Sequence, residues 1–181
     1  MSKLIFLSDV DGVMNTGRFF YTTEGKVMKE FGSDDADALN LLSKFMDIHF
    51  VSGDKRGFPI TKKRIEDDMG FRLDMVSTFD RLSWIREKYP LQDVVYMGDG
   101  IFDGLVFPHV GYSIAPGNSF PETKRRAKFV TEAVGGDGAV AEAVVHLMEK
   151  FFGGFNLEQL DLSKGIGLWT ATGPKNMYER T

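Results

Sequence analysis

Carboxylates stand at the ends of apolar runs in this chain, at spacings that could bind a metal ion. Asp9 and Asp11 lie two positions apart after the first run, and Asp99 follows a later one. In parallel sheets the residues just after the strands meet at one crevice, so we expect these side chains to converge. Converging carboxylates repel one another and are stable chiefly around a hard cation. The pattern therefore predicts a Mg²⁺ site with Asp9 and Asp99 as side-chain ligands, completed by water and substrate phosphate oxygens.

Ser52 and Gly53 follow another apolar run and are suited to binding phosphate. A serine hydroxyl and exposed amides hold phosphate oxygens without adding charge, so the substrate is predicted to be phosphorylated. Two carboxylates at one reacting centre can take different roles, because their surroundings shift their pKa values apart. We expect metal-bound Asp9 to stay ionised and attack phosphorus. Asp11 would protonate the leaving oxygen and then activate the water that splits the aspartyl phosphate.

Each of these pieces has a simpler explanation when it is taken alone. Asp-x-Asp-Gly at 9–12 is also turn and calcium-loop chemistry, and Ser52-Gly53 is also a turn. Asp99 and Asp103 would also keep a loop soluble. Their positions after three predicted strands, in chain order, favour one shared site.

The elements that must position these residues alternate along the chain. Apolar runs predict strands at 3–8, 48–52, 94–98, 111–115 and 128–131. Helix-period segments lie between them at 34–46, 60–69, 79–88 and 119–127, the last with Ser119 as a plausible cap. This alternation predicts an α/β fold, a doubly wound parallel sheet with right-handed crossovers.

Two segments depart from the alternation. Residues 18–31 are interpreted as a small β-hairpin inserted after the first strand, and 153–181 as a glycine-rich C-terminal tail, leaving a domain over 1–152. Between Ser52 and Asp99 there is space only for a helix, a short strand and another helix. No cap domain is therefore expected.

Composition excludes several classes of protein. The chain has 181 residues, of which 43% are hydrophobic and 27% charged, as in one globular domain. A net charge of −4 without a long basic run argues against nucleic acid. No cysteine occurs, and the three histidines have no partner at metal-ligand spacing. No apolar run is long enough for a signal peptide or a membrane span, so a cytoplasmic protein is expected.

Three motifs together resemble the haloacid dehalogenase superfamily: SDVDGV at 8–13, VSGD at 51–54 and YMGDGIFD at 96–103. The similarity runs from about residue 3 to 149. GGDGAVAE at 135–142 resembles one subgroup, the capless phosphatases of 3-deoxy-D-manno-octulosonate 8-phosphate and nonulosonate 9-phosphate. The resemblance implies a Rossmann-like haloacid dehalogenase fold and a Mg²⁺-dependent phosphomonoesterase acting on an eight- or nine-carbon 3-deoxy-keto sugar acid.

The resemblance also implies a role for each motif residue. Asp9 would be the nucleophile and Asp11 the acid/base. Mg²⁺ would be held by the Asp9 and Asp99 side chains and the backbone carbonyl of Asp11, and phosphate by Ser52. Asp103 would support the basic residue of the site.

The basic residue is where the sequence departs from the family. Relatives usually have a lysine at the start of the helix before the third motif, whereas this chain offers Arg81, with Lys62 or Lys63 as alternatives. Arginine also binds phosphate, but through a planar fork rather than a point charge. Gly100 and Phe102 stand where close relatives often have Asp and Asn, which affects fine positioning more than the reaction class.

Substrate recognition rests on fewer residues. Asp54 and Lys55 resemble the pair found in relatives that act on nine-carbon acids. Arg64, with Arg56, could meet the substrate carboxylate. The alternative is that this segment is the solvated start of a helix.

An uncapped site leaves the intermediate open to water unless something covers it. In the family that this chain resembles, the hairpin of an adjacent protomer does so, which predicts a homotetramer with hairpin 18–31 at the interface. Packing of the hairpin on its own sheet is the alternative. Residues 165–169 of the tail either cross the site or form a free end. Two competing functions are a phosphoacceptor receiver domain and a non-catalytic oligomerisation module of the same fold.

Overall fold

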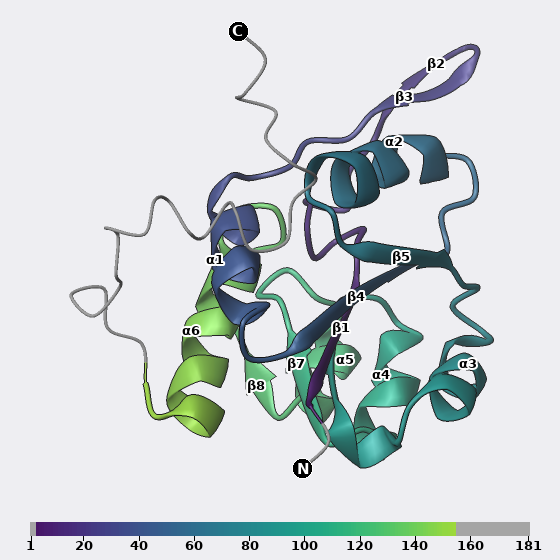
Figure 1. Ribbon diagram of the computed structural model, residues 1–181. Helices are drawn as coiled ribbons and strands as arrows, with labels where there is room; N and C mark the ends of the chain where they lie inside the picture. Colours follow the sequence, from purple (N-terminus) through teal and green to yellow (C-terminus); the bar gives the residue numbers. More distant parts are fainter. Residues whose placement is uncertain (1–2, 155–181) are drawn as a thin grey trace, which may run out of the picture.

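The computed structural model describes residues 3–154 of the chain. Its centre is a six-stranded sheet in the order β5-β4-β1-β6-β7-β8, in which every pairing is parallel. The strands are β1 (Ile5–Asp9), β4 (Asp47–Ser52), β5 (Arg72–Met75), β6 (Val94–Met97), β7 (Tyr112–Ala115) and β8 (Phe129–Val130). Helices cover both faces (Figure 1). The predicted doubly wound α/β fold is confirmed.

The middle of the sheet is the most buried part, as expected for parallel strands covered on both faces. All five residues of β1 are buried, and β1 pairs with β4 on one side and β6 on the other. Asp9 lies opposite Val51, one residue before Ser52. The three predicted site loops therefore leave adjacent strands at the same edge of the sheet.

α-Helices and shorter helical turns cover the sheet on its two faces. They are α1 (Asp34–Leu42), α2 (Phe58–Lys62), α3 (Arg81–Lys88), α4 (Asp103–Val106), α5 (Pro121–Arg126) and α6 (Ala139–Phe152), with shorter turns η1 (Lys63–Asp68), η2 (Leu91–Asp93) and η3 (Phe107–His109). On one face, α1 and α6 pack over a core that includes Phe6 and Phe50. On the other, α3 and the turn after α4 pack over Leu7 and Tyr96. The sheet is thus held rigid from both sides.

Several predicted helix boundaries are wrong. The first helix ends at Leu42 rather than residue 46, and turns follow it. The second starts at Phe58, with a proline in its first turn, and continues as a π-helical turn. Ser119 is not a cap: Phe120 precedes the helix and Pro121 begins it, because the fixed φ of proline suits the first helical position.

The sequence interpretation lacks two helices, α4 and the long α6. Val140, Val144 and Leu147 of α6 are buried against the sheet. Glycines in the left-handed conformation, Gly138 and Gly153, bound this helix at its two ends. The chain after α6 lies outside the described residues, so the division at residue 152 and the interpretation of the tail stay predictions.

The predicted hairpin is present and stands away from the sheet (Figure 1). It consists of β2 (Phe20–Thr22) and β3 (Gly25–Met28), paired antiparallel. The hairpin was predicted to extend to residue 31, whereas β3 ends at Met28 and the chain then turns back to the body of the domain. No helix in residues 3–154 has the length and apolar character needed to cross a membrane.

Candidate active site

A cleft of about 360 Å³ opens beyond the carboxyl ends of the central strands. The base of the hairpin forms one wall, and the loops before α3 and α4 form the other. Its lining residues are Asp9, Asp11, Gly17, Phe19, Lys26, Gly53, Asp54, Thr78, Asp99, Gly100, Ile101, Phe102 and Asp103. Most of the predicted site residues are therefore brought to one place.

Asp9 ends β1 and is held from two sides. Its Oδ1 accepts a hydrogen bond from the amide of Val10 at 2.8 Å, and its Oδ2 lies 2.8 Å from Nη1 of Arg81. Burial raises the pKa of Asp9 to about 6, an effect that Arg81 opposes and Asp103 reinforces. The carboxylate is thus fixed in position at the floor of the cleft.

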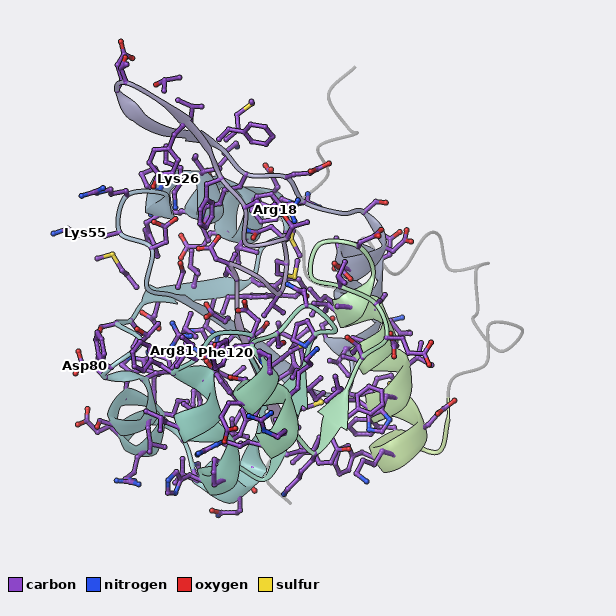
Figure 2. All side chains as sticks on the ribbon, turned by 180° about the vertical axis from the view of Figure 1, so that it is seen from behind. Arg18, Lys26, Lys55, Asp80, Arg81 and Phe120 are labelled. Carbon is purple, nitrogen blue, oxygen red and sulfur yellow. The ribbon has the colours of Figure 1, made fainter. Side chains whose placement is uncertain are left out.

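Arg81, the first residue of α3, is fully buried below the cleft. Besides Asp9, its Nη1 donates to the hydroxyl of Tyr96 at 2.9 Å and to Oδ1 of Asp103 at 3.3 Å, and its Nη2 donates to the carbonyl of Val76 at 3.3 Å. In Figure 2, Arg81 lies inside the molecule, whereas its neighbour Asp80 points outward.

The two alternatives to Arg81 lie away from the site. Lys62 and Lys63 have side chains that are 56% and 67% exposed, and they pair with acids on their own turn. Of the three candidates for the basic residue, the structure therefore brings only Arg81 to the carboxylates.

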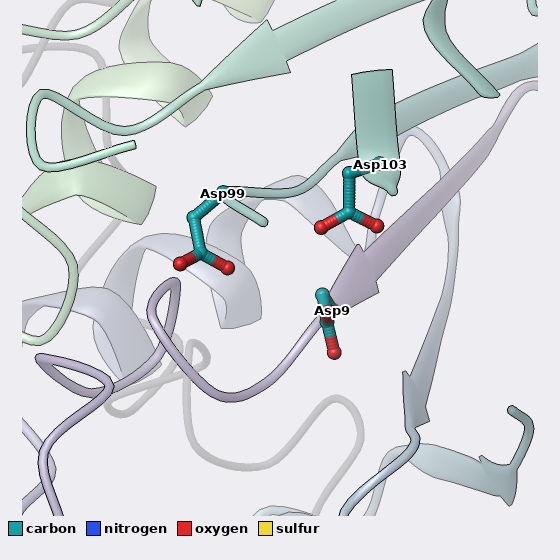
Figure 3. Close-up of side chains that lie close together, drawn as sticks. All are labelled: Asp9, Asp99 and Asp103. Carbon is teal, nitrogen blue, oxygen red and sulfur yellow. The ribbon is translucent and has the colours of Figure 1, made fainter. Parts of the chain in front are cut away.

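Asp9, Asp99 and Asp103 form an acidic cluster (Figure 3). One carboxylate oxygen from each lies within 4.8 Å of the others, a spacing that fits a single metal ion. Asp103 is already engaged, because Tyr96 donates to its Oδ1 at 2.5 Å and the Gly100 amide to its Oδ2 at 2.9 Å. Asp9 and Asp99, the two carboxylates predicted from the sequence to bind the metal, both belong to this cluster.

Asp99 is a half-buried carboxyl group without an ion pair among residues 3–154. Burial, together with the nearby charges of Asp9 and Asp103, raises its pKa to about 8. Gly12 lies against it: a Cβ at this position, where φ is +89°, would come within 2.0 Å of Asp99 Oδ2. Glycine is therefore required for the loop after β1 to approach Asp99.

Asp11 faces the other side of the cleft and has a partner that the sequence did not indicate. Nζ of Lys29 lies 2.7 Å from its Oδ1 and 2.9 Å from its Oδ2. Asn15 also donates to Oδ1 at 2.9 Å. Lys29 lies at the base of the hairpin, directly after β3, and only the folded chain brings it to residue 11.

Ser52 ends β4 and is buried beside Asp11. Its hydroxyl donates to Asp11 Oδ2 at 3.4 Å and accepts from the Asp54 amide at 3.2 Å. Gly53 is exposed and lines the cleft, so its position agrees with the predicted phosphate site.

The predicted substrate residues divide into two groups. Asp54 lines the cleft, but its carboxylate is already bound by Lys26 and Lys29. Lys55 and Arg64 are not among the residues that line the cleft. Lys55 points outward in Figure 2, and Arg64 lies near Asp37 on the first helix.

A further contact joins two loops around the site. Asn118 donates to the Gly12 carbonyl at 3.2 Å and accepts from the Gly135 amide at 2.7 Å. At Gly135, a Cβ would lie 2.0 Å from the same carbonyl. The GGDGAVAE motif therefore packs its glycines against the loop that carries Asp11, which accounts physically for this part of the sequence.

Comparison with known proteins agrees with this geometry. Residues 83–144 match the family model described as haloacid dehalogenase-like hydrolase. A protein of Yersinia pestis named 3-deoxy-D-manno-octulosonate 8-phosphate phosphatase is 28% identical over 148 residues, covering 76% of this chain and 75% of the relative. The enzyme of the same name from Escherichia coli K12 is 29% identical over 148 residues, with the same coverage of each chain.

Solved structures of phosphatases with this name also resemble the chain. The crystal structure of the Yersinia pestis phosphatase has a TM-score of 0.69 at 26% identity, covering 80% of each chain. A Moraxella catarrhalis phosphatase of the same name, in complex with magnesium, phosphate and a KDO molecule, has a TM-score of 0.67 at 21% identity, covering 80% of this chain and 85% of that one. At this identity the second likeness concerns the fold alone.

The chain resembles the haloacid dehalogenase-like hydrolases, in sequence over residues 83–144 and in fold. The relatives support a phosphatase of the subgroup that resembles 3-deoxy-D-manno-octulosonate 8-phosphate phosphatases. These relatives favour the phosphatase over the receiver domain and the non-catalytic module.

Proposed function

We propose that this chain is a Mg²⁺-dependent phosphomonoesterase that hydrolyses the phosphate of an eight- or nine-carbon 3-deoxy-keto sugar acid through an aspartyl phosphate. The observation that carries the proposal is the convergence of Asp9, Asp11 and Asp99 at one cleft, with Ser52 beside them. The named activity of the relatives supports the substrate class.

The donor set fits a hard divalent cation. Asp9 and Asp99 offer carboxylate oxygens in the acidic cluster, and within residues 3–154 the half-buried Asp99 carboxyl has no ion-pair partner. The Asp11 carbonyl would be the third protein ligand. When bound, Mg²⁺ would polarise a phosphate oxygen and offset the negative charge of the site.

In the first half of the reaction, an oxygen of Asp9 attacks phosphorus. The bond between phosphorus and the leaving oxygen breaks, and Asp11 transfers its proton to that oxygen, releasing the sugar acid. In the second half, Asp11 takes a proton from a water molecule that attacks phosphorus. The bond to Asp9 breaks, and inorganic phosphate and the free carboxylate are restored.

Three groups position the phosphate in this scheme. The Ser52 hydroxyl and the exposed amide of Gly53 donate hydrogen bonds to the phosphate oxygens at the end of β4. Arg81 holds Asp9 in line from below and supplies positive charge at the floor of the cleft. Asp103 keeps the guanidinium in place through the hydrogen bond to Nη1.

The assembly is a second part of the proposal: we infer a homotetramer with hairpin 18–31 at the interface. The hairpin stands free of its own sheet and carries four exposed apolar side chains, Phe20, Tyr21, Val27 and Met28. Clusters of exposed apolar side chains typically mark an interface. A neighbouring hairpin would cover the cleft, over which the described part of the chain places no cap domain.

The activity is tested by incubating the protein with Mg²⁺ and a panel of sugar phosphates, and measuring the release of inorganic phosphate. Eight- and nine-carbon keto-acid phosphates should be turned over, chelation with EDTA should stop the reaction, and Asp9→Asn should be inactive. Turnover by Asp9→Asn at the rate of the wild type would refute the aspartyl-phosphate mechanism. Release only from other sugar phosphates would refute the substrate class.

A further inference from the structure

The base of the hairpin places a buried lysine beneath the cleft. The side chain of Lys29 is 0% exposed, although the hairpin strand before it is solvent-exposed over much of its length. A buried ammonium group is costly unless carboxylates and hydrogen bonds compensate it. We therefore asked which groups surround Lys29 and what their arrangement does.

Lys29 has acceptors on three separate segments. Its Nζ lies 2.7 Å from Asp11 Oδ1, 2.9 Å from Asp54 Oδ2 and 2.7 Å from the hydroxyl of Thr61. An ammonium group has three hydrogen-bond donors, so these acceptors use its full capacity. No donor is left for a substrate, and Lys29 therefore acts on the site through Asp11.

Lys26, the other lysine of the hairpin, shares the Asp54 partner of Lys29 but not its partner Asp11. Lys26 also pairs with Asp54, and it lies 3.3 Å from the centre of the Phe19 ring. Figure 2 shows Lys26 at the base of the hairpin. No contact between Lys26 and Asp11 is present, so both lysines anchor the hairpin but only Lys29 holds the acid/base residue.

We propose that Lys29 is a positioning residue that holds the Asp11 carboxyl group in line with the leaving oxygen. This inference rests on the proposed function. Lys29 contacts both oxygens of the Asp11 carboxyl group, Asn15 donates to Oδ1 and Ser52 donates to Oδ2, and these contacts together restrict its rotation. Proton transfer requires hydrogen-bond distance to the leaving oxygen, so a small rotation of Asp11 would slow it.

Proton transfer matters for some leaving groups and not for others. A sugar hydroxyl leaves as a strongly basic alkoxide unless it is protonated, whereas p-nitrophenolate leaves without a proton at neutral pH. Loss of the positioning contact should therefore slow the hydrolysis of an alkyl phosphate much more than that of an aryl phosphate. A merely structural role for Lys29 would slow both by the same factor.

The test compares kcat for ribose 5-phosphate and p-nitrophenyl phosphate in wild type, Lys29→Met and Lys26→Met. In Lys29→Met we expect the alkyl rate to fall about tenfold to a hundredfold, with the aryl rate changed less than about threefold. The ratio of the two rates in Lys26→Met should stay that of the wild type. Asp11→Asn should show the same selective loss as Lys29→Met, but a larger one.

A second variant serves in case Lys29→Met does not fold. Thr61→Val keeps the lysine and removes one of its three acceptors. It should therefore slow the hydrolysis of the alkyl phosphate more than that of the aryl phosphate, but by a smaller factor than Lys29→Met. Equal losses for both substrates, or a shift of the ratio in Lys26→Met, would overturn the role of Lys29. If Asp11→Asn shows no selective loss, or the wild type hydrolyses neither compound, the proposed function itself fails and the inference with it.

Discussion

Asp9 and Asp11 stand two positions apart, yet their side chains have different surroundings. Asp9 is buried against Arg81 and faces the acidic cluster, whereas Asp11 is held by Lys29 on the hairpin side. An extended chain would direct side chains two positions apart to the same side, but β1 ends at Asp9 and the chain then turns through Asp11 and Gly12, which separates the two carboxylates. These separate surroundings are what allow one carboxylate to attack and the other to move a proton.

Asp99 links metal binding to pH-dependent stability at the residue scale. The folded pKa of Asp99 is raised from its ordinary value of 3.8 to about 8, so the folded state binds this proton more tightly than the unfolded state. Without metal, the free energy of unfolding should therefore fall as pH rises through this interval. In Asp99→Asn the fall in the free energy of unfolding should be smaller. It should occur mainly where Asp9 loses its proton, because the pKa of Asp9 is about 6.

Urea unfolding at about pH 5 and about pH 9, with and without Mg²⁺, measures this effect. At a Mg²⁺ concentration about a hundred times its Kd, the wild type should gain about 2.7 kcal/mol, and Asp99→Asn should gain much less. Equal gains in the two proteins would show that Asp99 is not a metal ligand.

Arg81 makes contacts that lysine cannot reproduce, so Arg81→Lys tests the departure from the family. The planar guanidinium reaches acceptors on β1, β6 and α4, whereas an ammonium group is a point donor. We expect Arg81→Lys to lose about 1–3 kcal/mol of stability and about tenfold in kcat. Thermal unfolding and phosphate-release kinetics measure both. Unchanged values would mean that only the charge matters at this position.

The sequence allowed some site residues to be predicted and not others, for a physical reason. Asp9, Ser52 and Asp99 follow strands, and parallel strands bring their carboxyl ends together, so chain order is enough to place them. Lys29 belongs to a hairpin whose local pattern is that of an exposed strand. Its burial depends on contacts with residues far along the chain, which local periodicity does not record.

At the element scale, the strands were easier to predict than the helices. Each buried strand is a short apolar run, whereas α6 begins after a run of glycines that resembles a loop. Those glycines are needed because Gly135 contacts the Gly12 carbonyl too closely for any side chain. The same residues that position the loop after β1 therefore conceal the start of the helix.

The hairpin is attached to the body of the domain through Asp54, which makes this attachment sensitive to acid. Burial raises the pKa of Asp54, but hydrogen bonds from Lys26 and Lys29 outweigh it and lower the pKa from 3.8 to about 2. A lowered folded pKa stabilises the protein above the unfolded value, and the contribution is lost as pH falls toward about 2.

Asp54→Asn should therefore be less stable than the wild type near neutral pH, and the difference should shrink as the solution is acidified below the unfolded pKa of Asp54. Urea unfolding of the two proteins across this range measures the difference. Asp74→Asn serves as a comparison at a paired aspartate outside the hairpin, because its partners are His49 on β4 and Lys88 on α3. A difference that stays constant down to low pH would contradict the role of Asp54 as an ionised anchor.

At the scale of the whole molecule, the domain exposes apolar side chains both at the cleft and on the hairpin. Within residues 3–154 no cap domain covers the cleft, and its outer wall includes exposed apolar residues such as Ile101 and Phe102. The two strands of the hairpin likewise expose apolar side chains, and they form a separate sheet from the central one. Two uncovered apolar surfaces on one chain are best accounted for by contact between copies.

We therefore expect light scattering to give four times the mass of the chain for the wild type. Tyr21→Glu combined with Met28→Glu should lower this mass, because charges placed in an apolar interface oppose association. Neither residue contacts Asp11 or Asp54, so the anchor at the hairpin base stays intact. Activity should fall along with the mass if a neighbouring copy covers the cleft. Val145→Glu, on α6 and away from the hairpin, is the matched control and should remain tetrameric. A wild type that is monomeric at assay concentration, yet fully active, would show that the open cleft works without a neighbour.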